Sequence, residues 1–154
     1  MKRILLNVFT LLTVFLFSSC LNSNLEDLPA FEEAEISSVN KVEYRYISDE
    51  ISDASQQPIV KNVTLSHSIT KDSDAGTLAI SVKVPDNFPK DQLGNLSTSA
   101  LVVSLNISSA ARIAPMNGSA ILGVPADWSK PNKYLITAAN GNKKEWTITL
   151  TLNK

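Results

Sequence analysis

Apolar and polar residues alternate with a period of two along most of the chain from residue 36 onward. Successive side chains of an extended strand point to opposite faces, so this period predicts strands with one buried face. No segment shows a sustained period of 3.6, and the predicted fold class is therefore all-β. The positions on the predicted buried faces are Val42, Tyr44, Tyr46, Val63, Leu65, His67, Ile69, Leu78, Ile80, Val82, Val84, Leu101, Val103, Leu105, Ile107, Tyr134, Ile136, Trp146, Ile148, Leu150 and Leu152.

Turn residues separate these runs. Asp72–Gly76 predicts a tight turn between two strands, and Asn140-Gly141 is a strong hairpin signal before the last strand. Pro85 and Pro89 are expected to end a strand, because proline cannot donate to a ladder. The other connections expected are a polar loop at 48–58, a helical turn within 90–97, and two short extended pieces at 112–114 and 120–122 around Pro115–Gly118. About seven short strands of this kind predict a β-sandwich.

The first twenty residues have the pattern of an export signal. Lys2 and Arg3 precede an uncharged, mostly apolar run at 4–17, and Ser18-Ser19-Cys20 follows. The run is shorter than the roughly 18 residues that a membrane-spanning helix needs. We therefore expect a cleaved signal peptide at residues 1–19, which takes no part in the fold.

The small residues directly before Cys20 resemble the lipobox of bacterial lipoproteins, although Phe17 stands where leucine is usual. The resemblance implies that the Cys20 thiol receives a lipid and becomes the new N-terminus. Cys20 is the only cysteine of the chain, and ordinary signal cleavage prefers a small residue where Phe17 stands. Several acyl chains on one residue hold a protein stably on a membrane, so the membrane is the first predicted partner.

Charge changes the picture only slightly. Cleavage removes two of the 14 basic residues and none of the 15 acidic ones, which leaves a mildly acidic domain. This balance argues against a nucleic-acid partner, which calls for a basic surface. Residues 20–35 carry five acids, no base and Pro29, which predicts a lipidated cysteine and a solvated tether before a domain at 36–154.

Several motifs resemble an immunoglobulin-like domain of uncharacterised Bacteroides-type lipoproteins. They are Asn106-Ile107-Ser108-Ser109, the Pro115–Gly118 turn, Trp128–Pro131, Tyr134–Ala138 and a final strand centred on Trp146. The resemblance implies an immunoglobulin-like β-sandwich of about seven strands. It also implies a lipid-anchored position on the outer membrane, facing the cell surface, with the periplasmic face as the alternative. The family motifs carry no chemistry of their own.

Reactive side chains are few. His67 is the only histidine and lies between apolar positions of its strand, so we expect a core or edge residue rather than a ligand or base. A serine or cysteine hydrolase site and a Cys/His metal site both lack their residues. Asp72, Asp74 and Gly76 are spaced like part of a calcium loop, but Lys83 stands where the bidentate glutamate is needed. No metal and no cofactor is therefore expected.

A sugar-binding site is the remaining candidate. An aromatic ring can stack on the apolar face of a pyranose while neighbouring amides and acids bond its hydroxyls. Trp128 lies in a predicted loop between Asp127 and Asn132, so these three residues form the candidate ligand site. The alternative role for Trp128 is an apolar plug at one end of the sandwich.

We therefore expect a non-enzymatic envelope module that binds a glycan or another envelope protein. The alternative is a structural spacer or an adhesion and assembly subunit that pairs through an exposed strand edge. An enzyme acting on polysaccharide is a third reading, with Asp49, Glu50 and Asp53 as its clustered acids.

Overall fold

Seven strands make up nearly all the regular structure of residues 30–154, the part of the chain that the computed structural model describes. The expected all-β class and strand number are confirmed. In these residues no helix has the length and apolar character needed to cross a membrane. The strands are β1 (Ile36–Ile51), β2 (Pro58–Asp72), β3 (Thr77–Lys83), β4 (Leu101–Ile107), β5 (Arg112–Met116), β6 (Asn132–Thr137) and β7 (Lys143–Asn153), with the 3-10 turns η1 (Lys90–Gln92) and η2 (Thr98–Ala100).

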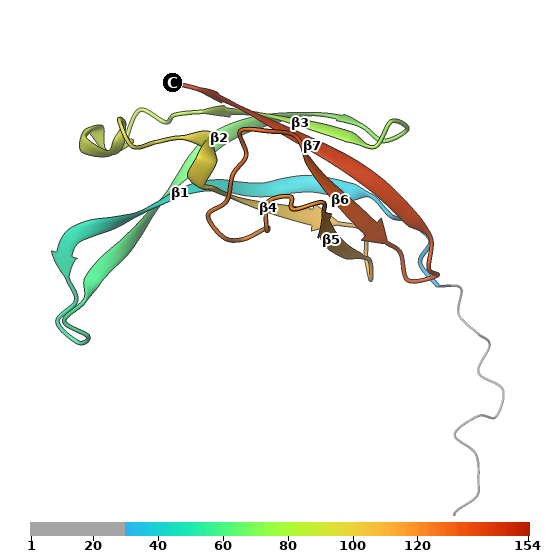
Figure 1. Cartoon of the computed structure of the whole chain (residues 1–154), viewed down its shortest axis with the longest axis horizontal. Coiled ribbons are helices and arrows are strands. Elements are labelled where there is room, and N and C mark those ends of the chain that lie inside the picture. Colours follow the sequence, from blue (N-terminus) through green and yellow to red (C-terminus); the bar gives the residue numbers. More distant parts are fainter. Residues whose placement is uncertain (1–29) are drawn as a thin grey trace, which may run out of the picture.

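The strands form one mixed sheet in the order β4-β1-β2-β3-β7-β6-β5. Strand β2 changes partner along its length: residues 58–65 pair with β1, and residues 66–72 pair with β3. The sheet thereby bends back over itself, and β1 with β4 comes to lie across from β3 with β7 (Figure 1). The expected sandwich of two separate sheets is instead a continuous sheet, because β2 belongs to both layers. All its neighbouring pairs are antiparallel except the parallel pair β3–β7.

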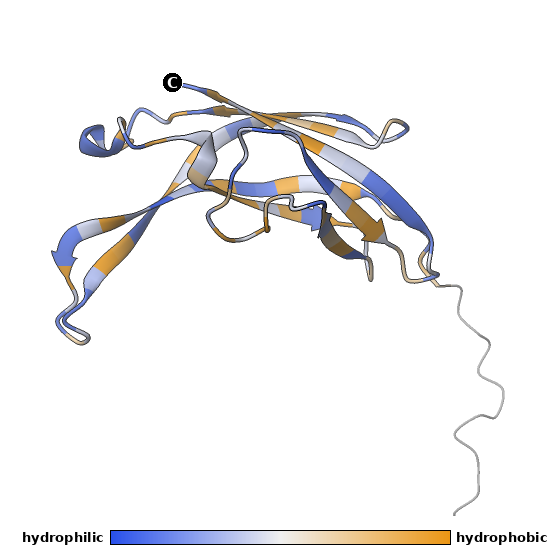
Figure 2. Ribbon diagram, viewed as in Figure 1, coloured by the Kyte–Doolittle hydropathy of each residue, from blue (hydrophilic) through white to orange (hydrophobic). Residues whose placement is uncertain are grey.

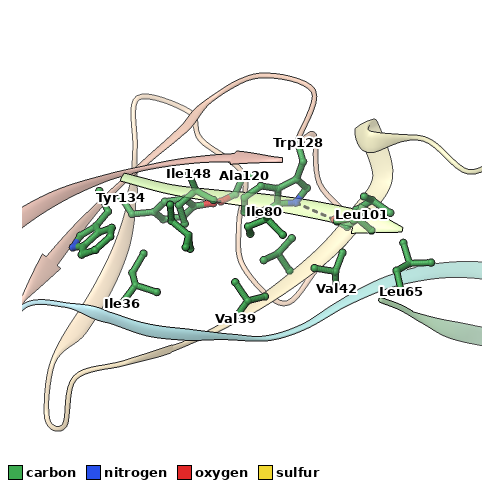
Figure 3. Close-up of a cluster of buried hydrophobic side chains, with 14 of the residues drawn as sticks. Ile36, Val39, Val42, Leu65, Ile80, Leu101, Ala120, Trp128, Tyr134 and Ile148 are labelled. Carbon is green, nitrogen blue, oxygen red and sulfur yellow. Dashed lines mark hydrogen bonds between the residues drawn. The ribbon is translucent and has the colours of Figure 1, made fainter. Parts of the chain in front are cut away.

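The core fills the space between these layers. Ile36, Val39 and Val42 of β1 point toward Ile80 and Ile148 of the opposite layer (Figure 3). Strand β3 shows the underlying pattern most clearly, since its alternate residues are buried and the others are exposed. Burying a large aliphatic side chain contributes about 1.5–3 kcal/mol, so the period-two pattern supplies most of the driving force for this fold.

An aromatic cap closes the core beneath the loop that precedes β6. The Trp128 indole Nε1 donates to the Leu101 carbonyl at 3.1 Å, and its ring stacks on Tyr134 with centroids 6.3 Å apart. Asn132 is fully buried: its Oδ1 accepts from the Ala120 amide at 2.8 Å, and its Nδ2 donates to two loop carbonyls. The Tyr134 hydroxyl donates to the Ala120 carbonyl at 2.6 Å. Side chains thus satisfy the backbone of Ala120, which explains why the expected extended piece at 120–122 forms no strand.

The hairpin between β1 and β2 projects beyond the body of the molecule (Figure 1). We call its residues 47–60 the arm. The expected loop at 48–58 is shorter than predicted, because Ile51 still pairs with Pro58. Apolar residues continue along both strands of the arm (Figure 2), where Ile47 is 72% exposed and its cross-strand partner Val60 is 64% exposed.

The chain enters the fold through a short clasp, residues 31–35, at the end opposite to the arm (Figure 1). Trp146 Nε1 donates to the Ala34 carbonyl at 3.1 Å, and the Asn140 amide donates to the Phe31 carbonyl at 3.2 Å. Glu35 pairs with Lys144. The last residues of the expected tether therefore belong to the folded domain, whereas the expected signal peptide and Cys20 lie outside the described residues.

A buried carboxylate lies on the face of β1 that points away from the core. The Glu43 side chain is only 2% exposed, although its position in the alternation predicts a solvent-facing residue. It accepts from Lys41 at 2.7 Å, from Asn62 at 3.1 Å and from Arg45 at 3.2 Å. The Lys41 hydrogen bond in particular holds the pKa of Glu43 below its ordinary value of 4.5, against the opposite effect of burial.

Replacing Asn132 by alanine is expected to lower the free energy of unfolding by about 2–4 kcal/mol, because the Ala120 amide and two loop carbonyls lose their partner. Urea unfolding followed by tryptophan fluorescence measures this change. The matched control is Asn87→Ala at an exposed position, where a change below about 0.5 kcal/mol is expected. Equal losses in the two variants would contradict the structural role of Asn132.

Replacing Glu43 by glutamine is expected to destabilise the protein by about 1–3 kcal/mol at neutral pH, since charge-assisted hydrogen bonds are lost. The folded-state pKa of Glu43 lies below 4.5, so its contribution is full above that pH and declines as the pH falls through the folded value. Urea unfolding of both proteins at pH 7 and pH 3 should show that the wild-type protein and the variant differ less in their free energy of unfolding at pH 3. A larger difference in the free energy of unfolding at pH 3 than at pH 7 would refute a stabilising role for the ionised Glu43 carboxylate.

Candidate functional site

Two of the three residues of the predicted ligand site have their side chains inside the protein. Trp128 is 1% exposed, and Asn132 is fully buried beneath the same loop. Their hydrogen bonds hold the aromatic cap, and the indole offers no open face on which a sugar ring can stack. Here Trp128 acts as the apolar plug that was the alternative reading of its loop.

Asp127 is the exposed member of that group. Its Oδ1 accepts from the Ser129 hydroxyl at 2.6 Å and from the Ser129 amide at 2.9 Å, and these bonds lower the pKa of the Asp127 carboxyl. The carboxylate therefore serves a local turn. Asp127 and Trp128 lie in the loop and Asn132 begins β6, and together the three predicted ligand residues present only one charged group to solvent.

The other polar candidates occupy turns and edges. Asp72 Oδ1 accepts from the Ala75 amide at 3.0 Å, and Gly76 has a φ of +62° where a Cβ would lie 2.4 Å from the Glu145 carbonyl oxygen. Asp72 and Gly76 are therefore spaced as the backbone geometry of the turn requires. Residues 30–154 contain no group of three or more acidic, histidine or cysteine side chains able to hold a metal. His67 is half-buried on β2 beside a surface hollow.

A more open site lies on the inner side of the arm, which we call the Tyr46 cleft. It has a volume of about 330 Å³. Strand β1 supplies one wall and β2 contributes Lys61, while η1 supplies the facing wall. The lining residues are Tyr46, Ile47, Ser48, Asp49, Glu50, Lys61, Asp91 and Gln92.

Tyr46 is positioned from behind by other aromatic rings. Its ring stacks on Tyr44 with centroids 5.9 Å apart, and Tyr44 in turn contacts Phe88 at 5.7 Å. Tyr44 is buried, and this burial raises the pKa of its hydroxyl. Tyr46 itself is half-buried, so part of its ring is available at the cleft. The core thereby supports a fixed aromatic surface at its edge.

Polar groups surround that ring. Lys61 pairs with Glu50 across the two strands, and this hydrogen bond raises the pKa of the Lys61 ammonium. Gln92 Nε2 donates to Asp91 at 2.9 Å, which orients the amide and the carboxylate along η1. Hydrogen-bond donors and acceptors thus lie beside an aromatic face, an arrangement suited to a ligand that is both flat and rich in hydroxyl groups.

The Tyr46 cleft was not identified from the sequence, where Tyr44 and Tyr46 were both assigned to the core. Beyond Tyr46 the strands carry apolar residues on their outer face as well, at Ile47, Ile51 and Val60. When apolar residues occupy both faces of a strand pair and only one layer of core is predicted, one of the two apolar faces is expected to stay exposed. That signal predicts a projecting hairpin, on which an inward aromatic residue is only partly covered.

The comparisons with known proteins concern the whole domain. A family model described as DUF5018-related matches residues 36–149. The chain is also similar to a crystal structure from Bacteroides fragilis NCTC 9343, described as that of "a putative secreted protein", at 39% identity and a TM-score of 0.72. The match covers 82% of this chain and 100% of that one. No curated protein matches the sequence.

These likenesses fit an extracytoplasmic protein, and neither description names an activity. The family model begins at the first residue of β1 and ends inside β7, so it spans every strand of the sheet. On this evidence the chain belongs to the DUF5018-related family.

Proposed function

We propose that the protein is a non-enzymatic binding module of the cell envelope and that its Tyr46 cleft holds a glycan. The observation that carries the proposal is the partly open Tyr46 ring, supported by Tyr44 and flanked by carboxylates and an amide. This replaces Trp128 by Tyr46 as the aromatic platform, because the Trp128 ring is enclosed.

The chemistry of the cleft favours binding over turnover. A pyranose presents C–H groups on its faces and hydroxyls around its rim. Tyr46 can contact such a face, while Asp49, Asp91 and Gln92 can accept or donate at the rim. Lys61 is engaged by Glu50, and no described histidine or cysteine lines the cleft to serve as a base or nucleophile.

Lipid anchoring at Cys20 would orient the Tyr46 cleft relative to the membrane. The chain enters at the clasp, and the arm lies at the other end of the molecule (Figure 1). A lipid on Cys20 would attach the clasp end to the outer membrane, on the cell-surface side by preference, and the cleft would then face away from the bilayer.

We also propose that the fold belongs to the immunoglobulin-like class. Its two facing layers and the motifs of the C-terminal half support this class.

The second candidate function, an assembly or spacer subunit, draws support from the arm. Ile47 and Val60 form an exposed apolar pair on its outer face. Residues 58–65 of β2 pair with β1 only, so in the described chain their other edge has no neighbouring strand. Such an edge can add a strand from a partner.

Replacing Cys20 by serine is expected to abolish lipid attachment and processing, because the thiol that receives the lipid is lost and ordinary cleavage disfavours Phe17. The variant should therefore accumulate as an unlipidated precursor that keeps residues 1–19. Mass spectrometry of the wild-type membrane fraction should show a diacylglyceryl group and a new N-terminus at Cys20. An unmodified Cys20 would contradict anchoring. Protease treatment of intact cells then distinguishes the surface from the periplasmic face.

Replacing Tyr46 by alanine is expected to weaken glycan binding by about 5- to 150-fold, since stacking against an aromatic ring contributes about 1–3 kcal/mol in comparable flat ligands. Affinity electrophoresis in gels containing starch, xylan, mannan or laminarin identifies the polysaccharide. Titration calorimetry with its hexasaccharide then gives the affinity.

Tyr46→Phe is the matched control, because it keeps the ring and should retain binding within about threefold, the loss expected for one neutral hydrogen bond. Thermal melts confirm that both variants fold. Absence of binding by the wild-type protein to every polysaccharide would refute the glycan role and favour the assembly subunit.

A further inference from the structure

A second hollow lies at the end of the β2–β3–β7 layer, where β3 and β7 finish. It has a volume of about 420 Å³. It is distinct from the Tyr46 cleft, with which it shares no lining residue. The residues that line it are Ser66, His67, Ser68, Ser81, Lys83, Val84, Asn153 and Lys154.

The strand register brings its polar residues together in two adjacent rows. In the first row Lys83 of β3 lies between Ser66 of β2 and Asn153 of β7. In the second row Ser81 lies between Ser68 and Thr151. Side chains directly opposite on neighbouring strands have Cβ atoms about 4.5–5.5 Å apart. One anion of ordinary size can therefore contact several of these groups at once.

Hydrogen bonds within the site already fix part of this arrangement. Asn153 Nδ2 donates to Ser81 Oγ at 2.9 Å, which leaves the Ser81 hydroxyl proton free to point into the hollow. The three strands belong to the paired body of the sheet, where each position is held by ladder bonds. The hydroxyls and the amide therefore sit on a rigid surface.

The charged side chains that line this hollow are basic, although the protein as a whole is mildly acidic. Two lysines and one histidine line it, and no carboxylate side chain does. Lys83 forms no ion pair in the described part of the chain. The whole chain has a formal net charge of -1, so this concentration of cationic and neutral donors is local.

We propose that this hollow is an oxyanion site that binds a sulfate, phosphate or carboxylate group. The Lys83 ammonium supplies the charge, and the Ser66, Ser68 and Ser81 hydroxyls supply short hydrogen bonds to the oxygens. The Lys154 ammonium, which donates to the Leu93 carbonyl at 3.4 Å, lies at the rim, whereas His67 faces the core side of β2 opposite Val82. The site is independent of the Tyr46 cleft, and it gives the module a means to recognise acidic groups on an envelope or extracellular polymer.

The test is a titration of residues 20–154 carrying Cys20→Ser with inorganic sulfate and with inorganic phosphate at constant ionic strength. Amide chemical shifts in NMR spectra report binding residue by residue. Saturable shifts confined to the middle of β2, around Ser66–Ser68, and to the C-terminal ends of β3 and β7 are expected. A wild-type protein without saturable shifts would overturn the proposal.

Lys83→Gln is expected to weaken binding about tenfold or more, because a charge-assisted contact is lost. The matched control Lys133→Gln removes the same charge from an exposed position of β6 and should change the affinity less than twofold. Equal losses in the two variants would show a diffuse charge effect and overturn the site. Thermal melts establish that each variant is folded.

Two further arms separate this site from the proposed glycan cleft and identify the source of the anion. Tyr46→Ala should leave sulfate binding unchanged, and loss of binding in that variant would place the anion in the Tyr46 cleft instead. A chondroitin sulfate hexasaccharide and vesicles containing phosphatidylglycerol then compare a glycan-borne with a lipid-borne anion. Lys83→Gln should weaken binding of whichever of these the wild-type protein binds by about tenfold or more, and an unchanged affinity in the variant would overturn the site.

Discussion

The change of partner at the middle of β2 determines the rest of the molecule. A flat seven-stranded sheet would leave one apolar face in water, and its burial is the largest favourable contribution to folding. Because β2 pairs with β1 up to Leu65 and with β3 from Ser66 onward, the sheet bends back and covers that face with its other half. The loops that cross the open ends then need only complete the closure, as Trp128 does above Leu101.

The same constraint creates the exposed regions. Each half of β2 pairs with a neighbouring strand along one edge only, residues 58–65 with β1 and residues 66–72 with β3. The half that pairs with β1 extends into the arm. The arm lacks a second layer, so Tyr46 is open on its inner side and Ile47 on its outer side. On the opposite half, β3 and β7 end together and form the basic hollow around Lys83. Both candidate surfaces are thus consequences of how one strand is divided.

The sequence predicted local features better than their arrangement. Alternation identified β1, β3, β4 and β7, since burial of one strand face depends on residue type alone. Alternation did not reveal that β2 pairs with β1 along one half and with β3 along the other. The pairing partner of a strand does not change the alternation of residues within that strand. Glu43 and Asn132 are buried by partners far along the chain, so their burial had no local signal. For the same reason the loop around Trp128 suggested an open site, although Leu101 and Tyr134 enclose it.

The clasp at residues 31–35 sets how the domain carries a mechanical load. It leads directly into β1, which runs without interruption from the entry end to the arm (Figure 1). A pull on the clasp, with the rest of the sheet held, therefore acts along β1 and loads its ladders to β2 and β4 in shear. In shear many hydrogen bonds share the force, whereas peeling breaks them one at a time. The fold therefore resists extraction of its first strand by a force on the N-terminal side.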